Sequence, residues 1–183
     1  MEIFLVVAAI TLIAFFLVSQ YNKLIRLNVQ VDEAFAQIEV QLQRRADLIP
    51  NLVETVKGYA SHERETFEKV TEARAKSQSA NGIADVAAAD NMLTQALRGL
   101  LAVAEAYPDL KASANFIQLQ EELSTTENKV AFARQFYNDT VRTLNTAVKT
   151  VPTNFFAGFA KVGEREFYEV DDPIARNVPK VSF

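Results

Sequence analysis

The chain has 183 residues, enough for one domain with a sizeable core and too few for two enzyme domains. Its 19 Lys and Arg against 23 Asp and Glu give a net charge of -4, so we expect no nucleic-acid partner. The lack of cysteine excludes disulfides, thiol nucleophiles and thiolate metal sites, and only 5 Gly and 5 Pro favour long helices.

The first apolar segment runs from Ile3 to Val18 and contains no charge and one polar residue, Thr11. As a helix of about 16 residues it spans about 24 Å, and residues 19–21 can extend it toward the roughly 30 Å of a bilayer core. We therefore predict that residues 1–22 form a transmembrane anchor.

Two other interpretations of this segment are open. A cleaved signal peptide would begin with positive charge and end in small residues, whereas this segment begins with Met1 and Glu2 and ends with Val18, Ser19 and Gln20. A buried core helix would need a domain that covers apolar residues on every face. A retained anchor fits the sequence better than either.

Basic residues follow the anchor and none precedes it. Lys23 and Arg26 come directly after it, and Arg44 and Arg45 come later. Because Lys and Arg collect on the cytoplasmic side of a membrane, this bias predicts an outside N-terminus and a cytoplasmic helical domain. A periplasmic domain is the alternative.

Residues 23–152 carry apolar residues at alternating spacings of three and four, the pattern of helices with one buried face. The predicted helices span about 23–46, 50–78, 84–106 and 113–151. We expect the anchor to continue into the first helix and Pro50, which has no amide hydrogen, to kink or end it. The fold class predicted is all-α: a transmembrane helix continuing into an antiparallel long-helix bundle, with an extended C-terminal tail.

The longest apolar stripe lies in the last predicted helix, between Ser113, which can cap it, and Pro152, which ends it. The stripe consists of Phe116, Leu119, Leu123, Val130, Tyr137, Val141, Leu144, Val148 and Val151. We expect it to lie in the core of the bundle, and a coiled-coil contact between subunits is the alternative.

Residues 153–183 form an aromatic segment followed by a tail that we expect to be extended. We expect Phe155, Phe156 and Phe159 to be buried in the core; the alternative is that they dip into the membrane interface. The tail, which ends at Phe183, either packs over the bundle or contacts another subunit. These four phenylalanines are the candidate interface residues.

No set of residues matches a common enzyme. The one histidine, His62, lies among charged residues without the second His that a helical zinc site requires four positions later. We expect Asp47, beside Arg44 and Arg45, to fix a helix junction rather than to act in catalysis. The sequence therefore predicts no catalytic activity, no cofactor and no metal.

Short motifs occur in order along nearly the whole chain. They are Tyr21 and Asn22, residues 44–53, residues 56–60, residues 104–111, residues 119–123 with Thr126 and Glu127, and Ala133 and Arg134 with residues 136–138. With these motifs the chain resembles the LemA family of bacterial membrane proteins. The motif residues that we expect to hold junctions and packing are Arg44, Arg45, Asp47, Pro50, Asn51, Lys57, Tyr59, Glu105, Tyr107, Pro108, Gln120, Glu122, Glu127, Arg134, Tyr137 and Asn138.

The resemblance implies a single-pass protein of the bacterial cytoplasmic membrane. The family has no established enzymatic activity and includes a magnetosome-building relative, which by analogy implies a role in organising membrane. We expect a scaffold that binds the lipid bilayer and other copies of itself, and that can also bind another membrane protein. The alternative is an accessory subunit that regulates a membrane enzyme such as a protease.

Some similar proteins carry a lipid-modified Cys just before the pair that matches Tyr21 and Asn22. That modification implies a helical domain outside the cytoplasm. This chain has Ser19 and Gln20 there, so it keeps an anchor without the lipid and the periplasmic alternative stays open.

Overall fold

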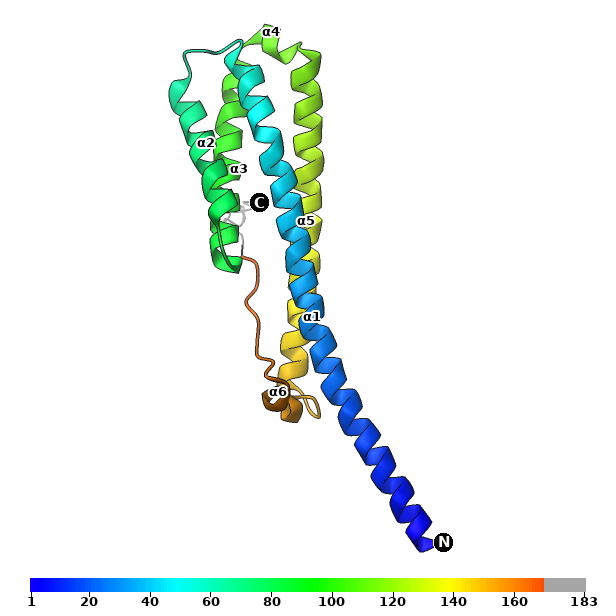
Figure 1. The fold of residues 1–183 in the computed structure, drawn as a ribbon. Helices are drawn as coiled ribbons and strands as arrows, with labels where there is room; N and C mark the ends of the chain where they lie inside the picture. The colour runs from blue at the N-terminus through cyan, green and yellow to red at the C-terminus, as the bar shows by residue number, and fades with distance from the viewer. Residues whose placement is uncertain (170–183) are drawn as a thin grey trace, which may run out of the picture. The chain divides into compact units, whose positions relative to one another are not determined.

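A computed structural model describes residues 1–169, which are mostly helical and contain no strand (Figure 1). The helices are α1 (Glu2–Lys57), α2 (Arg64–Ser79), α3 (Ile83–Glu105), α4 (Pro108–Lys111), α5 (Ala114–Lys149) and α6 (Asn154–Ala160). The all-α prediction is confirmed. Two compact units can be distinguished: unit 1 holds Met1–Ile38 and Ala133–Phe167, and unit 2 holds Glu39–Phe132 with Tyr168 and Glu169.

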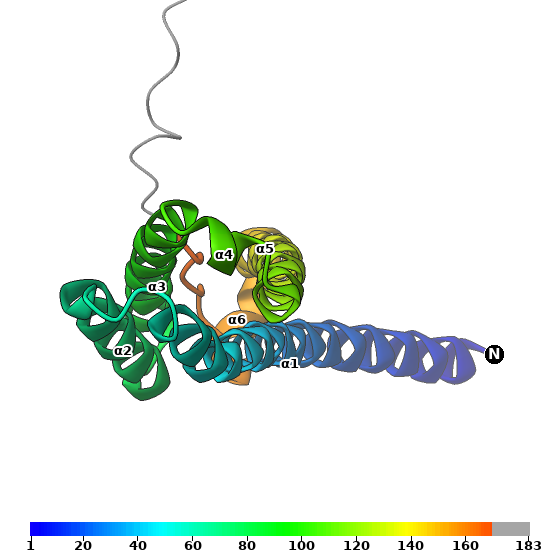
Figure 2. The ribbon, with the colours of Figure 1, turned by 90° about the horizontal axis from the view of Figure 1, so that it is seen from above.

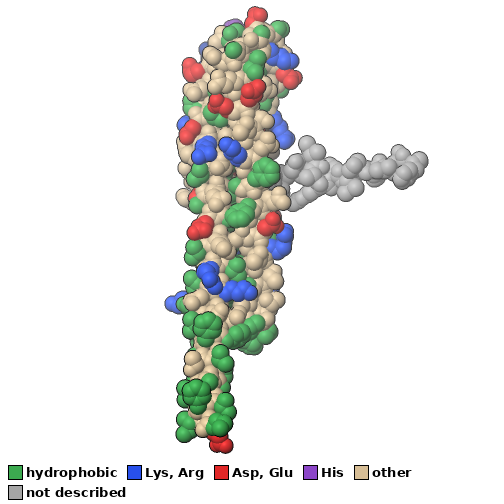
Figure 3. Space-filling view, turned by 90° about the vertical axis from the view of Figure 1, so that its right-hand side faces the viewer, with side chains coloured by type: hydrophobic (Ala, Val, Ile, Leu, Met, Phe, Trp, Pro, Cys, Tyr) green, Lys and Arg blue, Asp and Glu red, His purple; other side chains and the backbone are tan. Residues whose placement is uncertain are grey.

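The N-terminal part of α1, in unit 1, is covered by no other part of residues 1–169. Residues 1–19 are all exposed, and the apolar stretch has a mean hydropathy of 2.6, long and apolar enough to cross a membrane. Figure 3 shows its hydrophobic side chains on the face drawn. The burial begins at Leu24, which is fully covered, so the apolar segment continues into a packed helix as predicted.

The rest of unit 1 is built on the two predicted stripes. On α1, Leu24, Val31, Ala34 and Ile38 are buried and Leu27 is half-buried, and the facing stripe of α5 is buried around Tyr137. The rings of Phe35 and Tyr137 lie 5.9 Å apart. The stripe of α5 therefore packs within the chain, except for Val151, which lies beyond the end of the helix and is 71% exposed.

The aromatic residues after α5 are not in the core, contrary to our expectation. Phe155 is 67% exposed and Phe159 is 83% exposed, while Phe156 is half-buried. The Thr153 hydroxyl donates to the carbonyls of Ala147 and Thr150, which turns the chain at the end of α5. The short α6 that follows carries its two exposed rings four residues apart, on one face.

Residues 162–169, at the start of the tail, form neither helix nor strand. In unit 1 the Asn145 side chain holds the backbone of Arg165 from both sides, donating to its carbonyl at 2.9 Å and accepting from its amide at 2.8 Å. A Lys149–Glu164 ion pair at 2.6 Å adds to this contact. The described part of the tail thus packs intramolecularly; Phe183 lies outside the described residues.

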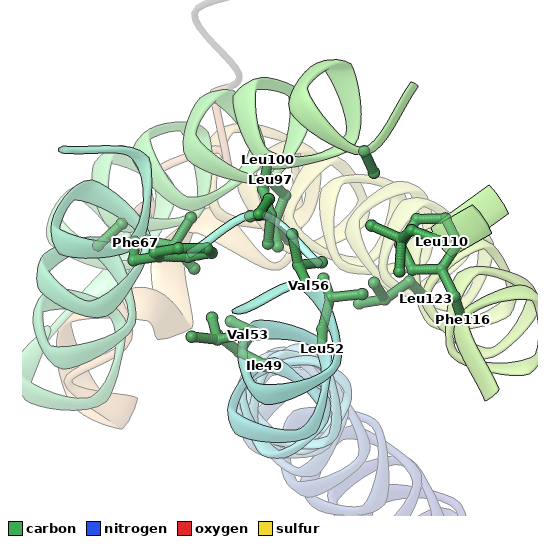
Figure 4. Packing of buried hydrophobic residues seen from close by; sticks show 14 of the residues in the cluster. Ile49, Leu52, Val53, Val56, Phe67, Leu97, Leu100, Leu110, Phe116 and Leu123 are labelled. Atoms are coloured by element: carbon green, nitrogen blue, oxygen red, sulfur yellow. The ribbon is translucent and has the colours of Figure 1, made fainter. Parts of the chain in front are cut away.

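Unit 2 is a bundle of the C-terminal part of α1 with α2, α3, α4 and the first part of α5 (Figure 2). Figure 4 shows its apolar side chains converging from all of these helices. The largest contributors include Leu52, Leu100, Leu110 and Phe116. Burying a Leu or Phe side chain is worth about 1.5–3 kcal/mol, so each of these residues contributes substantially to the stability of the unit.

Of the two effects expected of Pro50, a kink or a helix end, the second does not occur: α1 continues to Lys57 and the break falls at residues 58–63. A proline at position 50 cannot donate the helical hydrogen bond to the carbonyl of Ala46. In the structure that carbonyl accepts instead from Nε of Arg74 on α2, at 3.0 Å. A side chain from the neighbouring helix thus replaces the missing backbone donor.

The other helix limits follow from local sequence. The helix α3 begins after Gly82, whose φ of 82° favours glycine, and covers the range predicted for it. Tyr107 is extended because it precedes a proline, and Pro108 occupies the first position of α4, where no amide donor is needed. The Tyr107 and Pro108 motif therefore shapes the turn between α3 and α5.

We predict that Arg74→Met lowers the free energy of unfolding by about 1–2 kcal/mol, because it leaves the Ala46 carbonyl without a donor. The loss should be smaller in a Pro50→Ala chain, whose residue 50 regains an amide hydrogen. Denaturation of the full chain in detergent, followed by circular dichroism, measures both. The control is Arg98→Met on the exposed face of α3, and equal losses in the two backgrounds would contradict the replacement.

Candidate functional site

The most unusual polar feature of unit 2 is a buried ionic cluster around Arg45 of α1. Arg45 is 2% exposed and Asp90 of α3 is 1% exposed, and their side chains form an ion pair at 3.1 Å. The second terminal nitrogen of Arg45 lies 3.0 Å from Glu127 of α5, whose side chain is about half exposed. The cluster therefore joins three helices through one arginine.

Neutral hydroxyl groups complete the cluster. Arg45 also donates to the hydroxyl of Thr94 at 3.0 Å, and the hydroxyl of Tyr168 donates to the second carboxylate oxygen of Asp90 at 2.9 Å. Both charged ends are thus held by several hydrogen bonds, as buried charges require. A shift of α1 along α3 would separate the pair and leave two buried charges, so the cluster fixes the register of these helices.

Asp47 does not take part in this cluster, contrary to our expectation. Side chains two positions apart on a helix point in nearly opposite directions, so Arg45 faces the core while Asp47 faces outward. Asp47 is exposed and accepts from the side chain of Gln43 at 2.7 Å. Of Arg44, Arg45 and Asp47, only Arg45 takes part in the buried cluster that joins three helices.

Arg44 and Asp47 instead line a groove of about 520 Å³ between α1 and α5, which we call the α1–α5 groove. The α5 side supplies Glu121, Glu122 and Lys129. The groove therefore carries charges of both signs, all on exposed side chains.

Exposed apolar side chains extend both walls of this groove. Val40 precedes Arg44 by four residues and is 49% exposed, and Phe132 follows Lys129 by three and is 73% exposed. Helical spacing places each on the same face as its charged neighbour.

Three motif residues lie in unit 1, at the buried face of α5. Tyr137 is fully buried, and its hydroxyl donates to the carbonyl of Glu166 at 2.9 Å. Burial raises the pKa of Tyr137, so the hydroxyl stays protonated and remains a donor at neutral pH. Arg134 and Asn138 are half-buried beside it. Tyr137 thus joins the segment after α6 to α5.

The remaining motif residues are spread over unit 2. Lys57 lies over the ring of Phe67, 5.7 Å from its centroid, and so ties the end of α1 to α2. Asn51, Tyr59, Glu105 and Gln120 are exposed. The structure therefore brings Arg45 and Glu127 into one cluster, Arg44, Asp47 and Glu122 into one groove, and Arg134, Tyr137 and Asn138 onto one stretch of α5.

Within residues 1–169 no group of three or more His, Asp or Glu side chains is placed to hold a metal ion. His62 is exposed in the turn after α1.

Several residues that matter in the structure were missed by sequence reasoning. Asp90 is the main one, and its signal is visible: it occupies the apolar stripe of α3 between Val86 and Leu93. Arg45 interrupts the stripe of α1 in the same way. A charged residue on a buried stripe needs a partner from another stripe. Thr94, Tyr168, Asn145 and Arg74 carry no comparable pattern.

Comparison with known proteins gives a consistent picture. The model of the LemA family matches residues 34–183. Protein LemA of Metamycoplasma hominis is 29% identical, over 78% of this chain and 66% of that protein, so the chain spans about two thirds of its length. Magnetosome protein MamQ of Magnetospirillum gryphiswaldense is 24% identical, over 88% of this chain and 71% of that protein. Magnetosome protein MamQ 1 of Paramagnetospirillum magneticum is 22% identical, over 90% of this chain and 71% of that protein.

We predict that Arg45→Met lowers the free energy of unfolding by about 3–5 kcal/mol, because it leaves the Asp90 carboxylate buried without its cation. Adding Asp90→Leu should recover a large part of this loss, since the unpaired charge is then removed. Arg44→Met is the matched control and should change stability by less than about 0.5 kcal/mol. Equal losses in the free energy of unfolding for Arg45→Met and Arg44→Met, measured by chemical denaturation, would contradict the structural role of the cluster.

Proposed function

This chain belongs to the LemA family, and from that premise we propose that it is a single-pass membrane scaffold that self-assembles and acts by binding rather than by catalysis. The proposal places it in the bacterial cytoplasmic membrane, with the N-terminus outside and the helical units in the cytoplasm.

The observation that carries the proposal is the uncovered part of α1. Isolated apolar side chains on a protein surface are common, but contiguous apolar patches of this extent mark an interaction with a membrane or another protein. Residues 1–19 are exposed on every side of the helix, so a partner that binds one face would leave the others in water. A bilayer covers all faces at once.

A binding role is supported by the way the chain uses its charged residues. A catalytic site needs charged groups in a position protected from solvent. Among the described residues, Arg45 and Asp90 form a buried ion pair, and with Glu127 this pair holds three helices together. Several motif residues outside this cluster, among them Arg44, Asp47, Asn51 and Glu122, lie on exposed surface, where they are available to a partner.

Self-assembly is supported by the α1–α5 groove. A two-fold contact between identical copies brings the same patch together from both sides, so the patch has to be complementary to itself. The groove meets this condition, because Arg44 and Lys129 of one copy can face Asp47 and Glu122 of the other. Val40 and Phe132 supply apolar area on the same faces. The long apolar stripe of α5, in contrast, is largely buried against other helices of the same chain.

The membrane-organising part of the proposal rests on analogy with the MamQ relatives, which are magnetosome proteins. Orientation rests on Lys23 and Arg26, which follow the apolar segment directly.

We predict that the full chain forms a homo-oligomer in mild detergent, measured by native mass spectrometry. A chain with Arg44→Glu and Lys129→Glu should be monomeric, and so should one with Asp47→Lys and Glu122→Lys, because like charges then face each other. Mixing the two altered chains should restore the complex. The control is Arg98→Glu on α3. A monomeric parent chain, or altered chains that still assemble, would contradict self-assembly through the groove.

We predict that Ser61→Cys, in the exposed turn after α1, reacts with a membrane-impermeant maleimide only after the cells are lysed. The chain has no cysteine of its own, so the label reports this site alone. Glu2→Cys is the matched control and should react in intact cells with a permeabilised outer membrane. The reverse pattern would show that the helical units are periplasmic.

A further inference from the structure

Unit 1 has a hollow of about 400 Å³ at the point where α1 changes from uncovered to covered. Gln20, Lys23 and Leu27 of α1 form one wall. A helix rises about 1.5 Å per residue, so Lys23 lies about 7 Å beyond Val18, the last residue of the apolar segment. If the apolar segment occupies the core of a bilayer, this wall lies at the depth of the lipid headgroups.

The opposite wall of the hollow is the end of α5 and the turn that follows it. Arg142 lies on this side, together with threonines of α5 and with Pro152 and Thr153 of the turn. The hydroxyls of Thr143, Thr146 and Thr150 each donate to a carbonyl of the preceding helical turn. The donors left for a ligand are therefore the Lys23 ammonium, the Arg142 guanidinium and the amide of Gln20.

The charge of this hollow is of one sign. Its lining residues include Lys23 and Arg142 and no Asp or Glu, whereas the α1–α5 groove contains both signs. Lys23 forms no ion pair within residues 1–169, and Arg142 contacts Asp139 at 2.8 Å on the surface of α5, where both side chains are largely exposed. Figure 3 shows basic side chains gathered next to the hydrophobic stretch of α1, on the face drawn. The hollow suits an anion.

The segment after the hollow carries exposed apolar side chains. Val151, Phe155 and Phe159 are 71%, 67% and 83% exposed. Figures 1 and 2 place α6 beside α1 in this unit. Short helices with one apolar face and neighbouring cations bind in the interfacial plane of a membrane that contains anionic lipids.

We propose that unit 1 holds an anionic phospholipid by its phosphate in the hollow between Lys23 and Arg142, while Phe155 and Phe159 of α6 enter the same leaflet. The inference rests on the proposed membrane span of α1 and adds a second, lipid-specific contact to it. The apolar segment of α1 is continuous with the hollow, so the acyl chains of the bound lipid lie along that helix. The contact would fix the tilt and rotation of α1 in the bilayer.

The absence of tryptophan makes the proposal directly testable, because one introduced Trp is the only indole in the chain. The full chain is reconstituted in nanodiscs that contain brominated lipids, which quench Trp fluorescence on contact. Phe15→Trp reports on the span, Phe159→Trp reports on α6, and Tyr59→Trp in the turn after α1 is the aqueous control. We expect quenching of the first two and none of the third.

The outcomes separate the two proposals. Quenching of Phe15→Trp without quenching of Phe159→Trp would leave the span intact and overturn the contact of α6 with lipid. A lack of quenching at Phe15→Trp would overturn the membrane span itself.

The headgroup is tested with Phe155→Trp and brominated lipid of one class at a time. At equal mole fraction, brominated phosphatidylglycerol should quench about threefold more than brominated phosphatidylcholine. Lys23→Gln with Arg142→Gln should remove this preference, and the control Lys111→Gln on α4 should keep it. Equal quenching by the two lipids in the parent chain, or a preference that survives the double substitution, would overturn the phosphate site.

Discussion

The first part of α1 is apolar on all sides and is covered by no other part of the described chain, and the account of this protein depends on that constraint. Each large apolar side chain left in water forgoes about 1.5–3 kcal/mol of burial energy, and this segment holds a continuous series of them. A bilayer removes the whole cost. With the segment in a bilayer, three other features fall near the lipid headgroups. They are Lys23 directly after the segment, a hollow without carboxylates, and two exposed phenylalanines on α6.

A second constraint governs unit 2. Arg45 lies in a helical core where an unpaired charge would be prohibitive, so Asp90, Glu127, Thr94 and Tyr168 are arranged around it. This arrangement explains why the segment around Arg45 combines charge with apolar periodicity. It also separates two neighbours in sequence: Arg45 is structural, whereas Arg44 lies on the surface groove that we propose as a self-association site.

Local pattern predicted the helices and buried stripes well, because spacing of apolar residues is a property of neighbouring positions. Local pattern did not predict the features that depend on contacts between residues far apart in the sequence. At Pro50 the helix continues, with the Ala46 carbonyl accepting from Arg74, which lies 28 positions from Ala46. The buried carboxylate partner of Arg45 lies 45 positions away, at Asp90, rather than at Asp47. The exposure of Phe155 and Phe159 depends on how Thr153 turns the chain at the end of α5. Of the candidate site, sequence predicted the importance of Arg45 and Glu127 but not Asp90, although its place on an apolar stripe is a usable signal.

The claim that the apolar segment of α1 lies in the bilayer is tested most directly by hydrogen–deuterium exchange of the full chain in nanodiscs. In lipid, the backbone amides of residues 5–18 have no access to water and should stay unexchanged for hours, as long as the core of unit 2 around Leu52 and Leu100. Exchange of these amides within seconds to minutes, with the core of unit 2 still protected, would show a helix frayed in water and would contradict the account.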